Sequence, residues 1–403
     1  MTAPWLTIVG IGEDGRDGLG PAALRALAQA ELVAGGRRHL ALAGPFSCET
    51  LAWPSPLADA FPGLLARRGR PVVVLASGDP FLHGIGATLS RLIAPEEMRV
   101  FPAPSSFSLA ASRLGWPLQD VAAISLHGLA AERILPLAQP GARVLALSWD
   151  ARTPALVGRL LTEAGFGDSR LTVLEALGGP RERLLSVRAA AADGLGPLAD
   201  LNLIGLEIRA APGARVLTKA PGLPDHLFEH DGQITKREIR ALALSALAPA
   251  VGERLWDVGA GAGSVAIEWM LAHPANRATA IEADPERAAR IGRNARAFGV
   301  PDLVLVTGRA PDALAGLPAP DAIFVGGGAT APGMIDALWQ ALKPGGRLVA
   351  HGVTLETEAL LFHESAERGG ELTRIGIARA GAVGGFRAFR PALPVTQWSV
   401  VKA

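Results

Sequence analysis

The stretch Leu255-Trp256-Asp257-Val258-Gly259-Ala260-Gly261-Ala262-Gly263 decides the fold of the second half of this 403-residue chain. Its first four residues read as a buried strand, and Val265–Trp269 opens a helix directly after the glycines. Glycines at such a turn let the backbone approach a ligand at the carboxyl end of a strand. Glu282 ends the next strand about twenty residues later, where a carboxylate can bind ribose hydroxyls. The pattern predicts the first βα turn of a doubly wound, nucleoside-binding domain.

The spacing of these glycines separates two ligand classes. Gly-x-Gly-x-Gly differs from the Gly-x-Gly-x-x-Gly of dinucleotide sites, so a nicotinamide-dependent oxidoreductase is the disfavoured alternative. S-adenosylmethionine suits the turn better, because it has no pyrophosphate and needs space for an amino-acid tail and a nucleoside. The glycines could instead form a purely structural turn, and Asp257 is as compatible with a structural role as with ligand contact.

The same half contains the other parts of a parallel sheet. We expect strands at 254–258, 277–281, 303–307, 322–325 and 347–350 separated by helices, with a helix at 236–247 before them. Residues 307–314 lie where S-adenosylmethionine-binding domains of this kind usually border the adenine. The segment Asp321–Gly328, which ends the fourth strand, lacks the Asn/Asp-Pro-Pro-Tyr of amino-group methylases, which disfavours DNA-adenine chemistry.

The first half repeats a strand, loop and helix rhythm, which predicts a second parallel α/β domain. Strands are expected at 6–12, 70–76, 98–102, 144–148, 171–175 and 203–208, with a helix over 22–33. The Pro- and Gly-rich segment 210–234 reads as a linker. The halves share no repeat, so we predict two unlike domains, 1–210 and 211–403.

Composition limits the partners and the location. The chain has 39 Lys and Arg against 38 Asp and Glu, so it lacks the excess of positive charge that would favour binding to a nucleic acid. Cys48 is the single cysteine, which excludes intramolecular disulfides and Cys-rich zinc sites and suggests a reducing compartment. The apolar run after Trp5 is too short for a signal peptide or membrane span. We expect a cytoplasmic protein with no metal, membrane or nucleic-acid partner.

Several motifs of the second half carry a family resemblance. They are Gly232–Glu238, the glycine turn, Ala280–Pro285, Gly308–Pro311, Gly326–Gly328 and Leu342–Arg347. Together they resemble the C-terminal half of the precorrin-6Y C5,15-methyltransferase (decarboxylating) family of cobalamin biosynthesis. The resemblance implies S-adenosylmethionine contacts at Thr235, Gly259, Ala260, Gly261, Ala262, Gly263, Glu282 and Ala310. This family often has Asp at the position of Glu282.

Four loops of the first half resemble the tetrapyrrole methylase fold, the N-terminal partner in the same fused family. They are Gly10–Gly15, Ser77–Gly84, Pro102–Phe107 and Ser125–Gly128. The resemblance implies two α/β lobes around a cleft, with Gly10–Gly12 in a substrate trough and a cofactor site at Gly78, Asp79, Gly84, Ser105 and Ser106. Many such enzymes read Gly-Pro-Gly-Asp where this chain has Gly12-Glu13-Asp14-Gly15, so no role is assigned to Asp14.

The resemblance also implies a reaction. The first domain would methylate C5 of the dihydro form of precorrin-6, and the second would methylate C15 and release the C12 acetate carboxyl as carbon dioxide, giving precorrin-8X. It implies one S-adenosylmethionine per domain and a homo-oligomer. Alternatives are a methylase of another small molecule, of protein or of RNA, and a non-catalytic S-adenosylmethionine-binding scaffold.

No Ser/His/Asp or Cys/His constellation is evident, and methyl transfer from a sulfonium needs none, since alignment and exclusion of water suffice. Candidate side chains for the chemistry are few. His127 could accept a proton in the trough, or be an ordinary loop histidine. Residues 371–403 carry five basic residues against Glu371 alone. We expect Arg379 or Arg387 to bind substrate carboxylates, because arginine offers bidentate pairing; solvated surface arginines are the alternative.

Overall fold

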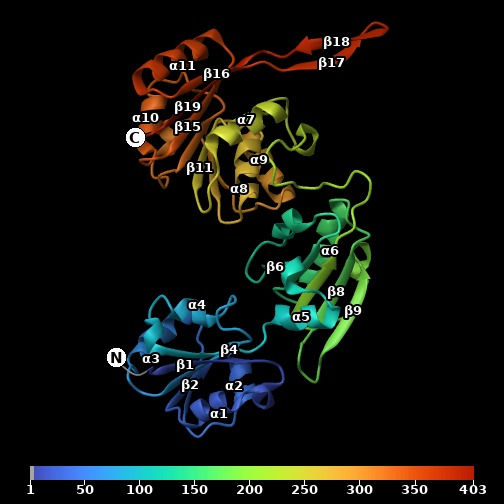
Figure 1. The fold of residues 1–403 in the computed structure, drawn as a ribbon, viewed down its shortest axis with the longest axis vertical. Coiled ribbons are helices and arrows are strands. Elements are labelled where there is room, and N and C mark those ends of the chain that lie inside the picture. Colours follow the sequence, from blue (N-terminus) through green and yellow to red (C-terminus); the bar gives the residue numbers. More distant parts are fainter. Residues whose placement is uncertain (1–3) are drawn as a thin grey trace. The chain divides into compact units, whose positions relative to one another are not determined.

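The computed structural model describes residues 4–403, which form two compact units (Figure 1). The first unit runs to Ala131 and continues over Leu137–Ala214. The second comprises Arg215–Ala403 together with the short segment Glu132–Pro136. Both units are mixed α/β structures.

The first lobe of the first unit is a five-stranded sheet in the order β3-β2-β4-β1-β5, in which every neighbouring pair is parallel. The central strand β4 is apolar and buried along almost its whole length, as expected for a parallel strand covered on both faces. The strands are β1 (Leu6–Ile11), β2 (Leu32–Gly35), β3 (Glu49–Ala52), β4 (Val72–Ser77) and β5 (Met98–Phe101), and the helices α1 (Pro21–Ala28), α2 (Arg37–Ala43), α3 (Phe61–Leu65) and α4 (Ile85–Leu89).

The expected helix over 22–33 is too long. Helix α1 ends at Ala28, and Leu32 and Val33 already belong to strand β2, where both side chains are buried. The apolar spacing of a buried helix face runs directly into the apolar residues of a buried strand. Periodicity alone cannot separate the two when only a few residues lie between them.

The second lobe is a five-stranded sheet in the order β6-β7-β10-β8-β9. Its elements are β6 (Val121–Ser125), β7 (Arg143–Leu147), β8 (Arg170–Glu175), β9 (Arg183–Arg188), β10 (Asn202–Glu207), α5 (Ser106–Leu114) and α6 (Thr153–Glu163). The expectation of an all-parallel arrangement is wrong here, because β10 is antiparallel to both β7 and β8, and β9 is antiparallel to β8. Strands β7 and β8 leave room for one strand between them, and β10 fills it in the opposite direction. A hydrophobic run does not encode strand direction.

The second unit contains a seven-stranded sheet in the order β13-β12-β11-β14-β15-β19-β16. The first five strands are parallel; at one edge β19 pairs antiparallel with β15, and β16 pairs antiparallel with β19. These two strands were absent from the sequence prediction. The strands are β11 (Arg254–Val258), β12 (Arg277–Glu282), β13 (Val304–Thr307), β14 (Ala322–Val325), β15 (Arg347–Gly352), β16 (Glu371–Ile375) and β19 (Val395–Val401).

Helices cover both faces of this sheet. They are α7 (Arg237–Leu247), α8 (Ser264–Ala272), α9 (Pro285–Ala297), α10 (Met334–Ala341) and α11 (Leu355–Arg368). Trp256 on β11 packs with buried residues of α10 and α11. Its neighbour Asp257 points to the opposite face, where its Oδ2 accepts a hydrogen bond from the Ala266 amide of α8, at 3.0 Å. The order of the strands reverses between β11 and β14, which is where open α/β sheets bind ligands.

A two-stranded hairpin, β17 (Ala378–Val383) and β18 (Phe386–Pro391), projects from the sheet of the second unit (Figure 1). Every residue of β18 is exposed, including Phe386 at 83% and Phe389 at 76%. An isolated hairpin is only marginally stable in water, so this exposed apolar surface needs an explanation beyond the fold.

The loop before α7, near the start of the second unit, is held in place by a buried ion pair. Arg240 of α7 is fully buried, and its Nε donates to Glu268 Oε1 of α8 at 2.6 Å. Glu268 also accepts the backbone amides of Gly222 and Leu223 at 2.6 and 3.0 Å. The guanidinium additionally donates to Asp225, at 3.1 Å, and to the carbonyls of Leu223 and Thr235. One arginine therefore fixes two helices and the preceding loop.

Substituting Arg240 with Met should lower the free energy of unfolding by about 3–5 kcal/mol, since it leaves the Glu268 carboxylate buried without its cation. Urea unfolding followed by tryptophan fluorescence would measure the loss. Arg237→Met is the matched control, because Arg237 is exposed on the same helix, and it should change the free energy by less than about 0.5 kcal/mol. Equal stability of the two variants would contradict this role of the ion pair.

Candidate active sites

A cavity of about 660 Å³ in the second unit lies at the carboxyl ends of β11 and β14, where the strand order reverses. Its volume is within the range of small-molecule sites. Residues of β11, β12 and β15, of the turns after β11 and β14, of helices α7 and α9 and of the segments around the hairpin line it, as does the loop before α7. Those with polar side chains are Gln233, Thr235, Lys236, Glu238, Glu282, Arg287, Arg309, His351 and Arg379.

The glycine turn after β11 forms one wall of the cavity. Gly259 has φ +68°, and a Cβ there would lie 2.8 Å from the carbonyl oxygen of Gly327, which follows β14. Gly261 has φ +58°, and a Cβ there would lie 2.9 Å from the Gln233 carbonyl oxygen. Both positions therefore require glycine for the backbone angle and for the space between neighbouring turns.

Glu282 connects this wall to the end of β12. Glu282 is 6% exposed, and its carboxylate accepts hydrogen bonds from the Gly261 amide at 2.8 Å and the Asp284 amide at 3.0 Å. The same side chain lines the cavity. A carboxylate has about four acceptor positions, so two remain for the hydroxyls of a ligand. Glu282 thus shapes the turn and presents acceptors to the cavity.

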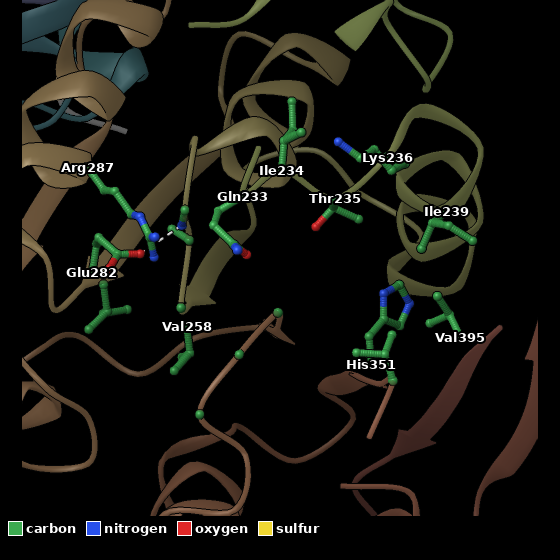
Figure 2. Close-up of a pocket in the computed structure, with 18 of the residues that line it drawn as sticks. Gln233, Ile234, Thr235, Lys236, Ile239, Val258, Glu282, Arg287, His351 and Val395 are labelled. Atoms are coloured by element: carbon green, nitrogen blue, oxygen red, sulfur yellow. Dashed lines mark hydrogen bonds between the residues drawn. The ribbon is translucent and has the colours of Figure 1, made fainter. Parts of the chain in front are cut away.

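The opposite end of the cavity is built from the loop before α7 and from the base of the hairpin. Figure 2 shows Thr235, Ile239, His351 and Val395 gathered there, away from Glu282. Glu238 and Arg379 form an ion pair at this end, and Lys236 is exposed. The cavity therefore has a glycine-rich end with Glu282 and Arg287, and an end with apolar side chains, an imidazole and an ion pair.

Most of the predicted contacts of the second unit lie together. Thr235, Gly259, Ala260, Gly261, Glu282 and Ala310 all line the cavity. Ala262 and Gly263 do not, because the turn has already entered α8 there: Ala262 is fully buried, and Gly263 is the N-cap and packs against Ile291. Arg379 lines the cavity, whereas Arg387 lies on β18 of the projecting hairpin and does not.

Sequence reasoning missed His351, Gln233 and Arg287 as lining residues. His351 lies near the carboxyl end of β15, an edge where ligand-binding residues of such sheets gather, so its place directly after the expected strand 347–350 was the available signal. Gln233 and Arg287 carried no comparable signal. Arg287 reaches the cavity from α9 and pairs with Asp231 at 2.9 Å.

The first unit has a smaller cleft of about 80 Å³, lined by both of its lobes. Gly12, Gly78 and Ser106 line it, as do Glu13 and Arg38. Its volume is well below the 300 Å³ or so at which sites that enclose small molecules begin. In this structure the cleft can hold a small part of a nucleoside ligand, but it does not enclose a whole one.

Only part of the predicted set of the first unit lies in this cleft. Asp79, Gly84 and Ser105 are outside the lining, although they build the adjacent turns. Asp79 Oδ1 accepts the Phe81 amide at 2.8 Å, and Ser105 caps α5 by accepting the Ser108 amide at 3.1 Å. His127 is exposed and lies against Trp149, with ring centroids 6.4 Å apart; it does not line the cleft.

The unusual Gly12-Glu13-Asp14-Gly15 loop divides its two acidic residues between different tasks. Asp14 folds back over the loop, where its carboxylate fills the space beside Gly12 and Gly18. Glu13 instead points into the cleft and forms an ion pair with Arg38, and its side chain is only 9% exposed. The structure therefore gives Asp14 a local packing role and brings Glu13, which the sequence analysis left without a role, to the cleft.

No cluster of three or more His, Cys, Asp or Glu side chains with the geometry of a metal site occurs within residues 4–403. None of the helices in this part of the chain is both long and apolar enough to span a bilayer.

Comparison with known proteins gives each unit a family. Residues 5–193 match the model described as tetrapyrrole (corrin/porphyrin) methylases, and residues 226–402 match the precorrin methyltransferase domain. A precorrin-6Y C(5,15)-methyltransferase [decarboxylating] from Sinorhizobium sp. is 57% identical over 403 residues, covering 100% of this chain and 97% of the relative. The chain belongs to the precorrin-6Y C(5,15)-methyltransferase (decarboxylating) family.

Two further relatives each match about half of this chain. A cobalt-precorrin-7 C(5)-methyltransferase from Salmonella typhimurium is 35% identical over 192 residues, 47% of this chain and 94% of the relative. A probable cobalt-precorrin-6B C(15)-methyltransferase (decarboxylating) from Pyrobaculum calidifontis is 40% identical over 182 residues, 43% of this chain and 93% of the relative.

The larger cavity fits the methyl donor of an S-adenosylmethionine-dependent family. Glycines clear the backbone at one end, Glu282 leaves acceptor positions for ribose hydroxyls, and the volume is sufficient for a nucleoside with an amino-acid tail. Asp257, just before the turn, is 1% exposed, and its Oδ1 has no hydrogen-bond partner among the described residues. Burial raises the pKa of Asp257 to about 7, with a smaller contribution from the charge of Glu282.

This pKa predicts a pH-dependent stability for this family member. The folded state binds the Asp257 proton more tightly than the unfolded chain, whose carboxyl has a pKa of 3.8. The contribution is therefore complete at low pH and is lost as the pH rises through 7. Without ligand, the free energy of unfolding should fall by on the order of 2–4 kcal/mol from this group between about pH 4 and 8.

Denaturant unfolding across this pH range would measure the effect. Asp257→Asn should flatten the decline, because the amide does not titrate. Asp312→Asn, at an exposed position, should leave the decline as it is in the unsubstituted protein. An equal decline in the Asp257→Asn variant would assign it to other groups.

Proposed function

We propose that this chain transfers two methyl groups from S-adenosylmethionine to a precorrin, at C5 and C15, and releases the C12 acetate carboxyl as carbon dioxide. The product would be precorrin-8X, formed from the dihydro form of precorrin-6. The observation that carries the proposal is the glycine turn and Glu282 at one end of a 660 Å³ cavity placed where the strand order reverses. The full-length relative from Sinorhizobium supports the choice of substrate.

We assign C15 methylation and decarboxylation to residues 211–403, and C5 methylation to residues 1–210. The assignment is supported by the two relatives that each match about half of this chain. The C(5)-methyltransferase matches over 192 residues and the C(15)-methyltransferase over 182, which is close to the lengths of the family matches at 5–193 and 226–402. We also propose one S-adenosylmethionine for each domain. For the second domain this rests on the cavity, and for the first on family membership alone, because its cleft does not enclose the ligand.

Bound S-adenosylmethionine supplies an electrophilic methyl group on a sulfonium. The chain's own residues then have three tasks: binding the donor, orienting the macrocycle and excluding water. Glu282 would hold the donor at the glycine-rich end, and the Thr235 hydroxyl would reach it from the opposite end. Arg379 also lies at that opposite end, where it forms an ion pair with Glu238. We propose that a substrate carboxylate replaces Glu238 there, because either carboxylate can accept the hydrogen bonds of the guanidinium group. Arg387 and His127 stay predictions for which the contacts offer no further support.

Two substitutions in the full chain test the assignment of the activities. Glu282→Gln should weaken S-adenosylmethionine binding about 10–100-fold, the value of a hydrogen bond to a charged group, and suppress release of carbon dioxide. Ser106→Leu, which fills the cleft of the first unit, should yield a decarboxylated product with a single added methyl group. Mass spectrometry of the products with a labelled methyl donor would count methyl groups and carboxyls.

Glu282→Asp and Glu286→Gln are the matched controls. The first keeps the carboxylate and should retain most of the affinity, and the second removes an exposed charge from the first turn of α9. If Ser106→Leu abolished decarboxylation while Glu282→Gln spared it, the two activities would have to be exchanged between the units. If the unsubstituted chain transferred no methyl group to the precorrin, the function itself would be wrong.

We further propose a homo-oligomer in which the hairpin β17–β18 contacts a second copy of the chain. Phe386 and Phe389 are the reason, because two phenylalanines at 83% and 76% exposure on a projecting hairpin gain stability only when they are covered. The single cysteine supports a cytoplasmic location, and the net charge of +1 gives no reason to invoke a nucleic acid.

Replacing Phe386 and Phe389 together by Ser should shift the protein to a smaller species in light scattering coupled to size exclusion. Leu355→Ser is the control, since Leu355 is 81% exposed at the start of α11 and lies outside the hairpin. A monomeric unsubstituted protein, or an unchanged mass in the double variant, would rule out this contact.

A further inference from the structure

His351 is the one imidazole among the residues that line the larger cavity. It lies on β15, directly opposite Gln397 of β19 in the antiparallel register. Figure 2 shows its ring projecting toward Thr235 and Ile239, at the end of the cavity away from Glu282. This end would receive the macrocycle if the glycine-rich end holds the methyl donor.

The contacts of the ring fix its orientation and leave one nitrogen available. Nε2 lies 2.9 Å from Gln397 Oε1, and the ring meets Phe324 edge to face at 5.0 Å between centroids. The Gln397 oxygen can only accept, so in this arrangement Nε2 carries the proton and Nδ1 has the free lone pair. Nδ1 makes no hydrogen bond to residues 4–403 and is not among their buried unpaired atoms, so it is open to the cavity.

The surroundings favour a neutral imidazole. Burial lowers the pKa of His351 below its usual 6.5, and the hydrogen bond with Gln397 only partly opposes this shift. Charged groups face the same space from two elements: Lys236 and Glu238 at the start of α7, and Arg379 on β17. Phe324 of β14 and Gln397 of β19 carry no charge, and Glu358 of α11 is engaged by Arg374.

The two carboxylates that line the cavity already have ion-pair or hydrogen-bond partners. Glu238 pairs with Arg379, and Glu282 accepts two backbone amides at the donor end. Arginine does not release its proton in proteins. Among the described residues that line the cavity, His351 therefore combines a free lone pair, a neutral state near pH 7 and a place at the substrate end.

We propose that His351 carries the proton between the two carbon atoms that react in the second unit. This inference rests on the proposed function. At the methylated carbon, the bond from sulfur to methyl breaks, a carbon–carbon bond forms, and a proton leaves. At the acetate, the bond to the carboxylate breaks, its electron pair enters the conjugated macrocycle, and the remaining methylene carbon takes up a proton. One proton is released and one is consumed, so no other reactant is needed.

A single neutral imidazole suits this exchange. Nδ1 accepts the proton from the methylated carbon, and Gln397 stabilises the resulting cation by holding the Nε2 proton. The imidazolium then returns the proton to the methylene carbon.

His351→Asn in the full-length protein tests the assignment. Loss of a general acid–base group should lower kcat for decarboxylating methylation at least about 100-fold. The dissociation constant for S-adenosylmethionine, measured by calorimetry without substrate, and the thermal unfolding temperature should stay unchanged. His363→Asn is the control, since His363 is exposed on α11 outside the cavity, and it should retain full kcat.

The pH dependence provides a readout that packing alone would not move. In the unsubstituted protein, kcat should fall below pH 6.5 as the imidazole is protonated, and His351→Asn should remove this limb. Gln397→Glu places a negative charge beside Nε2, so the limb should move to higher pH. The pKa of His351, followed by nitrogen-15 NMR in the ligand-free protein, should rise in the same variant.

Each outcome bears on one proposal. Undiminished kcat in His351→Asn, or a limb that Gln397→Glu does not shift while the NMR pKa rises, would overturn the role of His351. An unsubstituted protein that binds S-adenosylmethionine but neither methylates nor decarboxylates the precorrin would instead overturn the proposed function, and with it this inference.

Discussion

The second unit depends on the ion pair between Arg240 and Glu268. A buried arginine and a buried glutamate stabilise a fold only if their remaining donors and acceptors are also used, and here they are used by the backbone of the preceding loop. The pair joins α7 to α8 and anchors the carbonyl of Thr235. Since Thr235 lines the cavity, an interaction that lies outside the site determines where one of its walls stands.

The glycine turn contributes the other wall through a steric constraint. The turn after β11 and the turn after β14 approach closely. A Cβ on Gly259 would lie 2.8 Å from the carbonyl oxygen of Gly327, which is too close for a carbon atom. Glu282 then holds Gly261 by its amide. The position of the ligand therefore follows from backbone geometry, and few side chains have to be placed with precision. This suits methyl transfer, in which alignment contributes more than a dedicated nucleophile.

The two ends of the cavity differ in how they are built. The glycine-rich end consists of consecutive residues of two βα turns, whereas His351, Gln397, Glu238 and Arg379 come from four separate elements. The antiparallel strand β19 brings Gln397 beside His351, and the start of β17 brings Arg379 beside Glu238. Strand β19 and the hairpin thus supply the partners of His351 and Glu238 at this end.

The sequence by itself determined the parts whose signal is local. The strand, glycine turn and helix at 255–269, the carboxylate at Glu282 and the parallel strands β11 to β15 follow from hydrophobic runs and from residues that only certain backbone angles accept. The family resemblance singled out six residues that line the cavity. The family motifs gave the reaction, because they occur in stretches of consecutive residues.

Tertiary structure alone decided what depends on distant parts of the chain. The direction of β10, the return of β19 to the edge of the sheet and the contact of His351 with Gln397 each join segments that no local pattern connects. Helix α1 ended earlier than its periodicity indicated because a buried helix face and a buried strand look alike in sequence. Glu13 and Asp14 took different roles although they are neighbours, since only the fold determines which side chain faces a cleft.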